Sequence, residues 1–101
     1  MIVVNAVILA TEETIEAMKN AISVMEGKSR AEDGCHDYTF SVELSNPEVL
    51  RITEKWETMG ALEAHFNTPH MADFQQVMAE NPPRSVQANF YEVTDVPAPG
   101  Q

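Results

Sequence analysis

The alternation of hydrophobic and polar positions changes its period along this chain, and the changes predict its elements. Residues 2–9 form a short apolar run rich in β-branched side chains, typical of a strand buried on both faces, although Asn5 sits in its middle. Residues 12–26 then carry isoleucine and methionine at helical spacing. Thr11 is a suitable N-cap and Gly27 a common helix stop, so the pattern predicts a strand followed by a helix.

The middle of the chain alternates with the period of two that strands require. The segment 34–44 predicts a second strand, and the segment 49–57 predicts a third. In the second strand one face carries His36, Tyr38, Phe40, Val42 and Leu44, and the other carries Cys35, Asp37, Thr39, Ser41 and Glu43. In the third strand one face carries Leu50, Ile52, Glu54 and Trp56. Glu54 is the exception there, because an acid stands in line with three apolar side chains.

Two short helical segments follow, and a last strand ends the pattern. Residues 59–67 carry apolar side chains at the spacing of a helix that packs one face against a core. Thr68 followed by Pro69 indicates a new helix start, because proline is favoured at the first helical position. The prolines at 82–83 end that second segment, and residues 85–94 predict the fourth strand.

The order of these elements predicts an α+β domain with the ferredoxin-like βαββαβ topology and an antiparallel sheet. We expect one domain over residues 1–96 and a flexible tail over residues 97–101. The helices would cover one face of the sheet and leave the other bare. Because the first strand is apolar on both faces and the next two strands add further apolar residues, we expect two copies to pack face to face as a homodimer. These further residues are Val42, Leu44, Leu50 and Ile52.

The charge and the cysteine content limit the possible binding partners and the expected cellular location. The chain has 16 acidic and 6 basic residues and a formal net charge of −10, so nucleic acid or an anionic membrane surface would repel it. Its single cysteine, Cys35, allows neither an intrachain disulfide nor a thiolate metal cluster. The apolar start is too short to span a bilayer and lacks the basic residues of a signal peptide, so we expect no membrane insertion and a cytoplasmic location.

Two histidines near the middle of the chain are candidate functional groups, and each has a structural alternative. His65 borders the buried stripe of its helix, where an imidazole could accept a proton inside an apolar pocket, but it could equally be a cap or surface residue. His70 stands in the first turn of the next helical segment and could be a surface or dimer-contact residue. Pro69 starts a new helix between them, so they do not share a helix face and we expect no metal site.

Three other positions also have both a structural and a functional interpretation. Trp56 is either a core residue or the wall for a flat ligand. Glu54 either pairs across the sheet or across a dimer interface, or it acts in a site, because a half-buried carboxylate needs a partner or a function. Asn5 is either a satisfied core amide or a group that holds a substrate oxygen. By contrast, Cys35 and His36 are neighbours on a strand and point to opposite faces, so they cannot form a nucleophile–base pair.

Several short runs of the sequence, taken together, resemble the antibiotic biosynthesis monooxygenase (ABM) domain family. These runs are Gly34-Cys35-His36-Asp37-Tyr38, Glu54-Lys55-Trp56-Glu57, Ala61-Leu62-Glu63-Ala64-His65-Phe66, Thr68-Pro69-His70 and Phe74. The similarity spans residues 2 to 94 and is closest to the small quinol monooxygenases. It implies a dimeric α+β barrel of two ferredoxin-like protomers. It also implies cofactor-independent oxidation of a quinol-like or polyketide-type aromatic molecule by dioxygen, without flavin, haem or metal.

The resemblance implies roles for particular residues. His65 would be the base, Asn5 would hold a substrate oxygen, and Glu54 would act as an acid or orient His65. The side chains that would line the substrate pocket are Tyr38, Trp56, Phe66 and His70. A haem-degrading branch of the same fold fits less well, because the position of its tryptophan holds His65 and its axial ligand falls near Gln75.

Two other functions on the same fold stay open at this point. One is a cofactor-free isomerase of a small ketone or a phosphorylated sugar, which would turn over without oxygen. The other is a non-catalytic small-ligand-binding or stress-response module. Such a module predicts that Glu54 and His65 are paired internally and that no cavity lies between helix and sheet.

Overall fold

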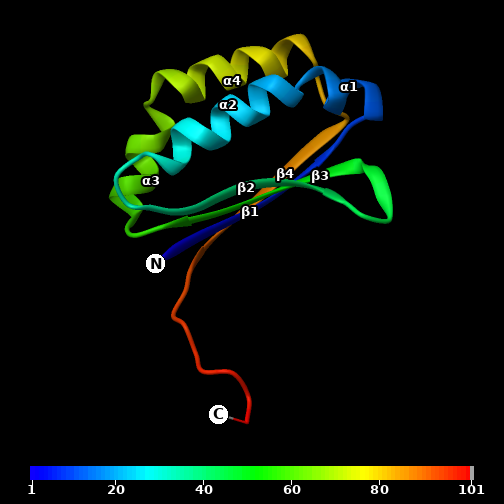
Figure 1. Ribbon diagram of the computed structural model, residues 1–101. Coiled ribbons are helices and arrows are strands. Elements are labelled where there is room, and N and C mark those ends of the chain that lie inside the picture. The colour runs from blue at the N-terminus through cyan, green and yellow to red at the C-terminus, as the bar shows by residue number, and fades with distance from the viewer. Residues whose placement is uncertain (101) are drawn as a thin grey trace.

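Eight helices and strands follow one another in the computed structural model, which describes residues 1–100. Their bounds are β1 (Ile2–Leu9), α1 (Glu12–Ala17), α2 (Lys19–Arg30), β2 (Cys35–Glu43), β3 (Asn46–Trp56), α3 (Met59–Phe66), α4 (Pro69–Glu80) and β4 (Ser85–Glu92). The strands form one antiparallel sheet in the order β2-β3-β1-β4, and the helices lie on one of its faces (Figure 1). The predicted α+β, ferredoxin-like fold is therefore confirmed.

The alternation along β1 separates a covered face of the sheet from an open face, on the side away from the helices. The residues of β1 on the covered face are almost fully buried: Ile2, Val4, Ala6 and Ile8. Asn5 is exposed on the open face, in register with Thr53 and Asn89 on the neighbouring strands. The expectation that the first strand is buried on both faces is wrong for the protomer, because the helices cover only one side.

The hydrophobic core lies between the covered face and the helices α2, α3 and α4. The helices contribute Met25, Leu62, Met71 and Phe74. Leu50, Ile52 and Trp56 of β3 pack against them, together with Tyr38 of β2. Leu50 and Ile52 are thus buried within the protomer and do not need a second copy for cover.

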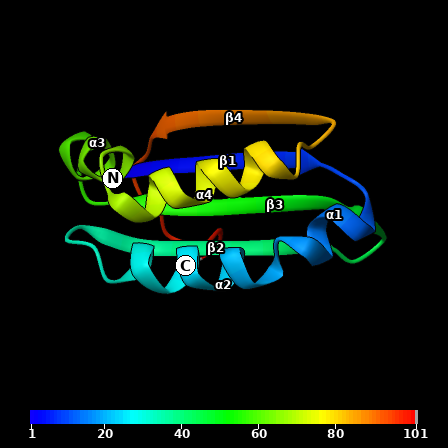
Figure 2. The same ribbon diagram turned by 90° about the horizontal axis from the view of Figure 1, so that it is seen from above.

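The outer strand β4 is the least covered part of the sheet. Figure 2 shows α2 and α4 running over the other strands, with β4 beyond them at the sheet edge. All eight of its residues are exposed, including the large side chains of Val86, Phe90 and Tyr91. This edge strand therefore carries part of the apolar surface that the protomer leaves uncovered.

The first helical segment is divided, and it extends further than the sequence predicts. The helices α1 and α2 meet at Met18, and α2 continues to Arg30, beyond the predicted stop at Gly27. Met25 and Ser29 are both buried, so the stripe of α2 that faces the core continues past Gly27. The burial of this stripe outweighs the low helix propensity of one glycine, because tertiary packing supplies most helical stability.

A bulge at the start of β2 changes which side chains face the core. The pairing with β3 passes from Cys35 to Asp37, so His36 is the extra residue. Cys35 packs against the core, whereas His36 is exposed and forms a hydrogen bond with the Glu57 carboxylate. The prediction that His36 shares a face with Tyr38 is therefore wrong. Burial raises the pKa of the Cys35 thiol to about 11, so this cysteine is not a reactive thiolate.

Candidate functional site

The turn between α2 and β2 carries the acid at the centre of the site, Glu32. The backbone of Glu32 is fixed on both sides, because its N–H donates to the carbonyl of Ser29 at 3.1 Å and its carbonyl accepts from the N–H of Cys35 at 3.2 Å. Gly34 adopts a φ of 80°, and a Cβ at this position would lie 2.8 Å from the Cβ of Ala61. This close approach requires glycine, and it brings the turn against α3.

The junction between α3 and α4 places two histidines near this turn. His65 lies in the last turn of α3, and His70 lies in the first turn of α4, which begins at Pro69 as predicted. Thr68 caps α4, since its Oγ1 accepts from the N–H of Met71 at 3.2 Å. The same hydroxyl donates to the carbonyl of His65 at 2.8 Å, so one side chain fixes the end of α3 and the start of α4.

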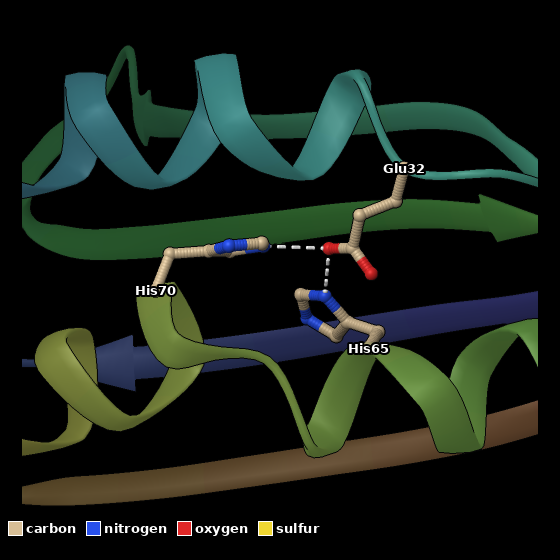
Figure 3. A group of neighbouring side chains, drawn as sticks. All are labelled: Glu32, His65 and His70. Carbon is tan, nitrogen blue, oxygen red and sulfur yellow. Dashed lines mark hydrogen bonds and ion pairs between the residues drawn. The ribbon is translucent and has the colours of Figure 1, made fainter.

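Both imidazoles point to the same oxygen of Glu32 (Figure 3). Oε2 of Glu32 lies 2.6 Å from Nδ1 of His65 and 2.7 Å from Nε2 of His70. The expectation that Pro69 separates the two histidines is wrong. A shared helix face is not needed, because the residue that joins them comes from another part of the chain, 33 and 38 residues earlier.

The two hydrogen bonds assign the protons of this cluster. An ionised carboxylate can only accept, so Nδ1 of His65 and Nε2 of His70 carry the protons when both rings are neutral. Nε2 of His65 then keeps its lone pair. This atom is buried and has no hydrogen-bond partner within residues 1–100. His65 therefore has one nitrogen oriented by a carboxylate and the other free to accept a proton, as in general-base catalysts.

Aromatic rings surround His65. The centroid of its ring lies 4.7 Å from that of Trp56 and 5.2 Å from that of Tyr38. The Phe66 ring is 5.8 Å away and is itself half exposed. His65 and Trp56 are both 0% exposed and in ring-to-ring contact, so no ligand fits between them in this conformation. The predicted lining residues therefore do gather at His65, but as a packed cluster.

Glu54 is buried on the same face of the sheet and has a different partner. Its Oε1 accepts a hydrogen bond from the indole Nε1 of Trp56 at 2.9 Å. Burial is the main cause that raises the pKa of Glu54 to about 7; the Trp56 hydrogen bond opposes the rise, and the nearby charge of Glu32 adds to it. Burial likewise raises the pKa of the Tyr38 phenol. The expectation that Glu54 orients His65 is wrong, because Glu32 makes that contact.

Asn5 lies apart from the cluster. Its side chain is exposed on the open face, whereas His65 is buried between α3 and the covered face. The sheet therefore stands between the two residues. Asn5 cannot hold a substrate oxygen beside His65 of the same protomer.

One groove on the protein surface reaches the cluster. It lies between α2 and α4, has a volume of about 210 Å³, and is lined by Asn20, Ala21, Val24, Met25, His70, Asp73, Phe74 and Val77. A second groove of about 240 Å³, between the α1–α2 segment and the strands β2 and β3, includes no residue of the cluster. His70 is therefore the cluster residue that borders an open cavity, and its side chain is 12% exposed.

Glu32 is the central residue that the sequence does not identify. The run Glu32-Asp33-Gly34 indicates a turn after a helix, but no local pattern connects it with histidines more than 30 residues later.

The cluster is also a set of candidate metal ligands. Glu32, His65 and His70 each offer one ligand atom, and these atoms lie within 4.8 Å of one another.

Among residues 1–100, no helix is long and apolar enough to cross a membrane.

The fold and the cluster define a small ferredoxin-like domain with a buried, carboxylate-oriented histidine. The family model described as "Antibiotic biosynthesis monooxygenase" matches residues 1–77. The chain therefore belongs to the antibiotic biosynthesis monooxygenase family, as its sequence motifs predict.

Individual relatives and solved structures show how far the similarity extends. The "Probable quinol monooxygenase YgiN" of Escherichia coli (strain K12) is 33% identical over 55 residues, which cover 46% of this chain and 53% of that protein. The chain thus matches about half the length of this relative. A conserved protein from Methanosarcina mazei Go1 has a TM-score of 0.85 at 27% identity, with 92% of both chains covered. A Deinococcus radiodurans protein assigned to the antibiotic biosynthesis monooxygenases has a TM-score of 0.87 at 24% identity, with 95% of both chains covered.

Proposed function

We propose that this protein is a cofactor-independent monooxygenase that oxidises a quinol-like or polyketide-type aromatic molecule with dioxygen. The observation that carries the proposal is the hydrogen bonding of His65. Its Nδ1 lies 2.6 Å from Oε2 of Glu32, and its buried Nε2 has no partner within residues 1–100. A buried acceptor without a partner is unusual in a folded protein and points to a ligand proton. Membership of the monooxygenase family and the partial match to YgiN support the reaction class.

His65 would act as the base in this reaction. A hydroxyl of the substrate transfers its proton to Nε2, and the Glu32 carboxylate stabilises the imidazolium that forms. The deprotonated aromatic substrate delocalises its charge and passes an electron to dioxygen, so the substrate itself is the reductant. The packed rings of Trp56 and Tyr38 keep water from the base.

The groove between α2 and α4 is the proposed path of the substrate to this base. It is lined mostly by apolar side chains and has His70 in its wall. Because Nε2 of His65 is buried, the side chains packed around it must move for a substrate ring to reach that atom. Under this proposal Tyr38, Trp56, Phe66 and His70 line the occupied site, with Glu54 behind Trp56.

Dioxygen uptake with menadiol tests the role of His65. His65→Asn is the informative variant, because the asparagine amide can still donate to Glu32 from near the position of Nδ1, while the acceptor at Nε2 is lost. We expect uptake to fall by about 10²- to 10⁴-fold, as for the loss of a general base. His36→Gln, at an exposed histidine that also contacts a carboxylate, is the control and should keep the wild-type rate. Equal uptake by His65→Asn and wild type would remove His65 as the base, and no uptake by the wild type with any quinol would reject the substrate class.

A non-catalytic small-ligand-binding module is the second candidate, and one observation favours it. His65 and Glu54 both have partners inside the protein, and the contact between Trp56 and His65 leaves no space for a ligand between these two rings. In that case the groove between α2 and α4 would bind its ligand without turnover. Binding of a quinone that is equal in wild type and His65→Asn, with no dioxygen uptake in either, would identify this function. The isomerase alternative would instead show turnover under anaerobic conditions.

We further propose that two copies form a homodimer through their open faces. This face carries the apolar side chains of Val3, Val7 and Leu9 from β1, and the half-exposed Tyr91 of β4 pairs with Val3 beside them. Asn5 would lie in that interface. Light scattering of the purified protein should give twice the mass of one chain, and Tyr91→Glu should give one. Leu44→Glu, at an exposed position in the β2–β3 turn, is the control and should stay dimeric. A monomeric wild type would overturn this proposal.

A further inference from the structure

We propose that Glu32, His65 and His70 bind one divalent first-row transition-metal ion of the Zn²⁺ class. Each residue offers one ligand atom, and the three atoms lie within 4.8 Å of one another. Figure 3 shows the Glu32 carboxylate and the two imidazoles converging from the α2–β2 turn, α3 and α4. This inference goes beyond the proposed oxidation, which uses the opposite nitrogen of His65 and no metal.

The three ligand atoms are already close to the separation that a metal ion requires. Zinc binds imidazole nitrogen and carboxylate oxygen at about 2.0 to 2.2 Å, so a tetrahedral ion holds its ligand atoms about 3.4 Å apart. Oε2 of Glu32 lies 2.6 Å from Nδ1 of His65 and 2.7 Å from Nε2 of His70. The carboxylate must therefore withdraw by less than about 1 Å, and the two imidazole nitrogens, which lie within 4.8 Å of each other, must approach by at most about 1.4 Å. Glu32 extends from a turn on a flexible side chain that is 13% exposed, so this movement is open to it.

The surroundings of the cluster favour a cation. The ion-pair partners of Glu32 in residues 1–100 are the two histidines, so no lysine or arginine competes for its charge. Two further acids lie nearby: Glu54, whose pKa the charge of Glu32 helps to raise, and Asp73, which lines the groove together with His70. The side chains of Glu32 and His70 are partly exposed, so water can complete the coordination.

The donor set selects the kind of metal. Two imidazoles with one carboxylate suit Zn²⁺, Co²⁺, Ni²⁺ and Fe²⁺, whereas Mg²⁺ and Ca²⁺ prefer all-oxygen sites. The exposed pair of His36 and Glu57 has only one imidazole and one carboxylate. It serves as an internal comparison, because it lacks the third ligand.

Metal binding would switch off the proposed base. A metal on Nδ1 of His65 leaves the remaining ring proton on Nε2, so the lone pair of Nε2 is no longer available. The metal and a substrate proton would therefore compete for the same imidazole, through its two nitrogens. Metal binding is expected to inhibit any turnover that depends on His65.

Titration of the chelator-treated full chain with Co²⁺, followed by visible absorption, tests the site. We expect one Co²⁺ per chain, displaced by Zn²⁺ but not by Mg²⁺. His70→Gln keeps a donor to Glu32 at the position of Nε2 but removes one imidazole ligand, so its affinity should fall at least about tenfold. His36→Gln should bind as the wild type does. No Co²⁺ binding by the wild type, or equal affinity in His70→Gln, would overturn the proposal.

A second measurement needs no variant. Nuclear magnetic resonance of the histidine rings in the wild-type chain should show Zn²⁺-induced shifts at His65 and His70 and none at His36. Shifts confined to His36, or equal at all three rings, would place the ion elsewhere. Neither measurement depends on turnover, so metal binding combined with no dioxygen uptake by the metal-free protein would reject only the proposed oxidation. Dioxygen uptake by the metal-free protein, combined with no metal binding, would reject only the metal site.

Discussion

The protein contains two contacts between histidine and carboxylate that are similar in chemistry and different in surroundings. His36 and Glu57 meet at the edge of β2 with side chains 47% and 59% exposed. Glu32, His65 and His70 meet between helices with side chains 13%, 0% and 12% exposed. In the exposed pair, water can take the place of either partner. In the cluster of Glu32, His65 and His70, burial limits this replacement. We therefore predict that burial, rather than residue type, decides how much each of these contacts stabilises the fold.

Removing the carboxylate from each group is the strongest way to test this comparison. Glu32→Ala leaves the N–H donors of His65 and His70 without their acceptor in a mostly buried site. We expect the free energy of unfolding to fall by about 3 to 5 kcal/mol. Glu57→Ala removes the exposed partner of His36 and should lower it by less than about 1 kcal/mol. Urea denaturation of the three proteins at pH 7 measures both changes.

A variant that keeps an acceptor sharpens the same measurement. Glu32→Gln retains an oxygen that can accept one of the two hydrogen bonds, so its loss of stability should be intermediate. Equal losses for Glu32→Ala and Glu57→Ala would mean that water satisfies the histidines of the cluster as readily as it satisfies His36.

Local patterns predict most of the fold. The period of two in β2 and β3 identifies both strands, and Thr68 with Pro69 marks the start of α4, because strand alternation and helix caps depend on neighbouring residues alone. Alternation also places Glu54 and Trp56 on one face, where they hydrogen-bond. The end of α2 is missed because packing of the stripe through Ser29, not the local glycine, determines it.

The site is less predictable because it depends on contacts between distant segments. Glu32 joins two histidines 33 and 38 residues away, and no local pattern records that meeting. The bulge at His36 reverses the predicted sides of Cys35 and His36, and strand alternation alone cannot reveal an inserted residue. The sequence pattern predicts Asn5 in a strand buried on both faces, since alternation tells which residues share a face but not which face the helices cover.

The pH dependence of stability extends the comparison to a third carboxyl group, Glu54. Burial raises the pKa of Glu54 from an ordinary 4.5 to about 7. Between these values the folded protein binds the proton and the unfolded chain does not, so this carboxyl makes the free energy of unfolding fall as the pH rises through that range. Above the folded-state pKa, Glu54 is ionised in both the folded and the unfolded protein, and the stabilising contribution of its protonated form is lost completely.

Glu54→Gln should remove this dependence while its amide oxygen still accepts the hydrogen bond from Trp56. Relative to wild type, the variant should gain up to about 3 kcal/mol in its free energy of unfolding between pH 5 and pH 8. Urea denaturation across that range measures the gain as a difference, which cancels the contributions common to both proteins. Glu57→Gln, which replaces an exposed carboxyl, is the control for the substitution itself. A difference between Glu54→Gln and wild type that stays constant from pH 5 to pH 8 would show that burial does not raise the pKa of Glu54.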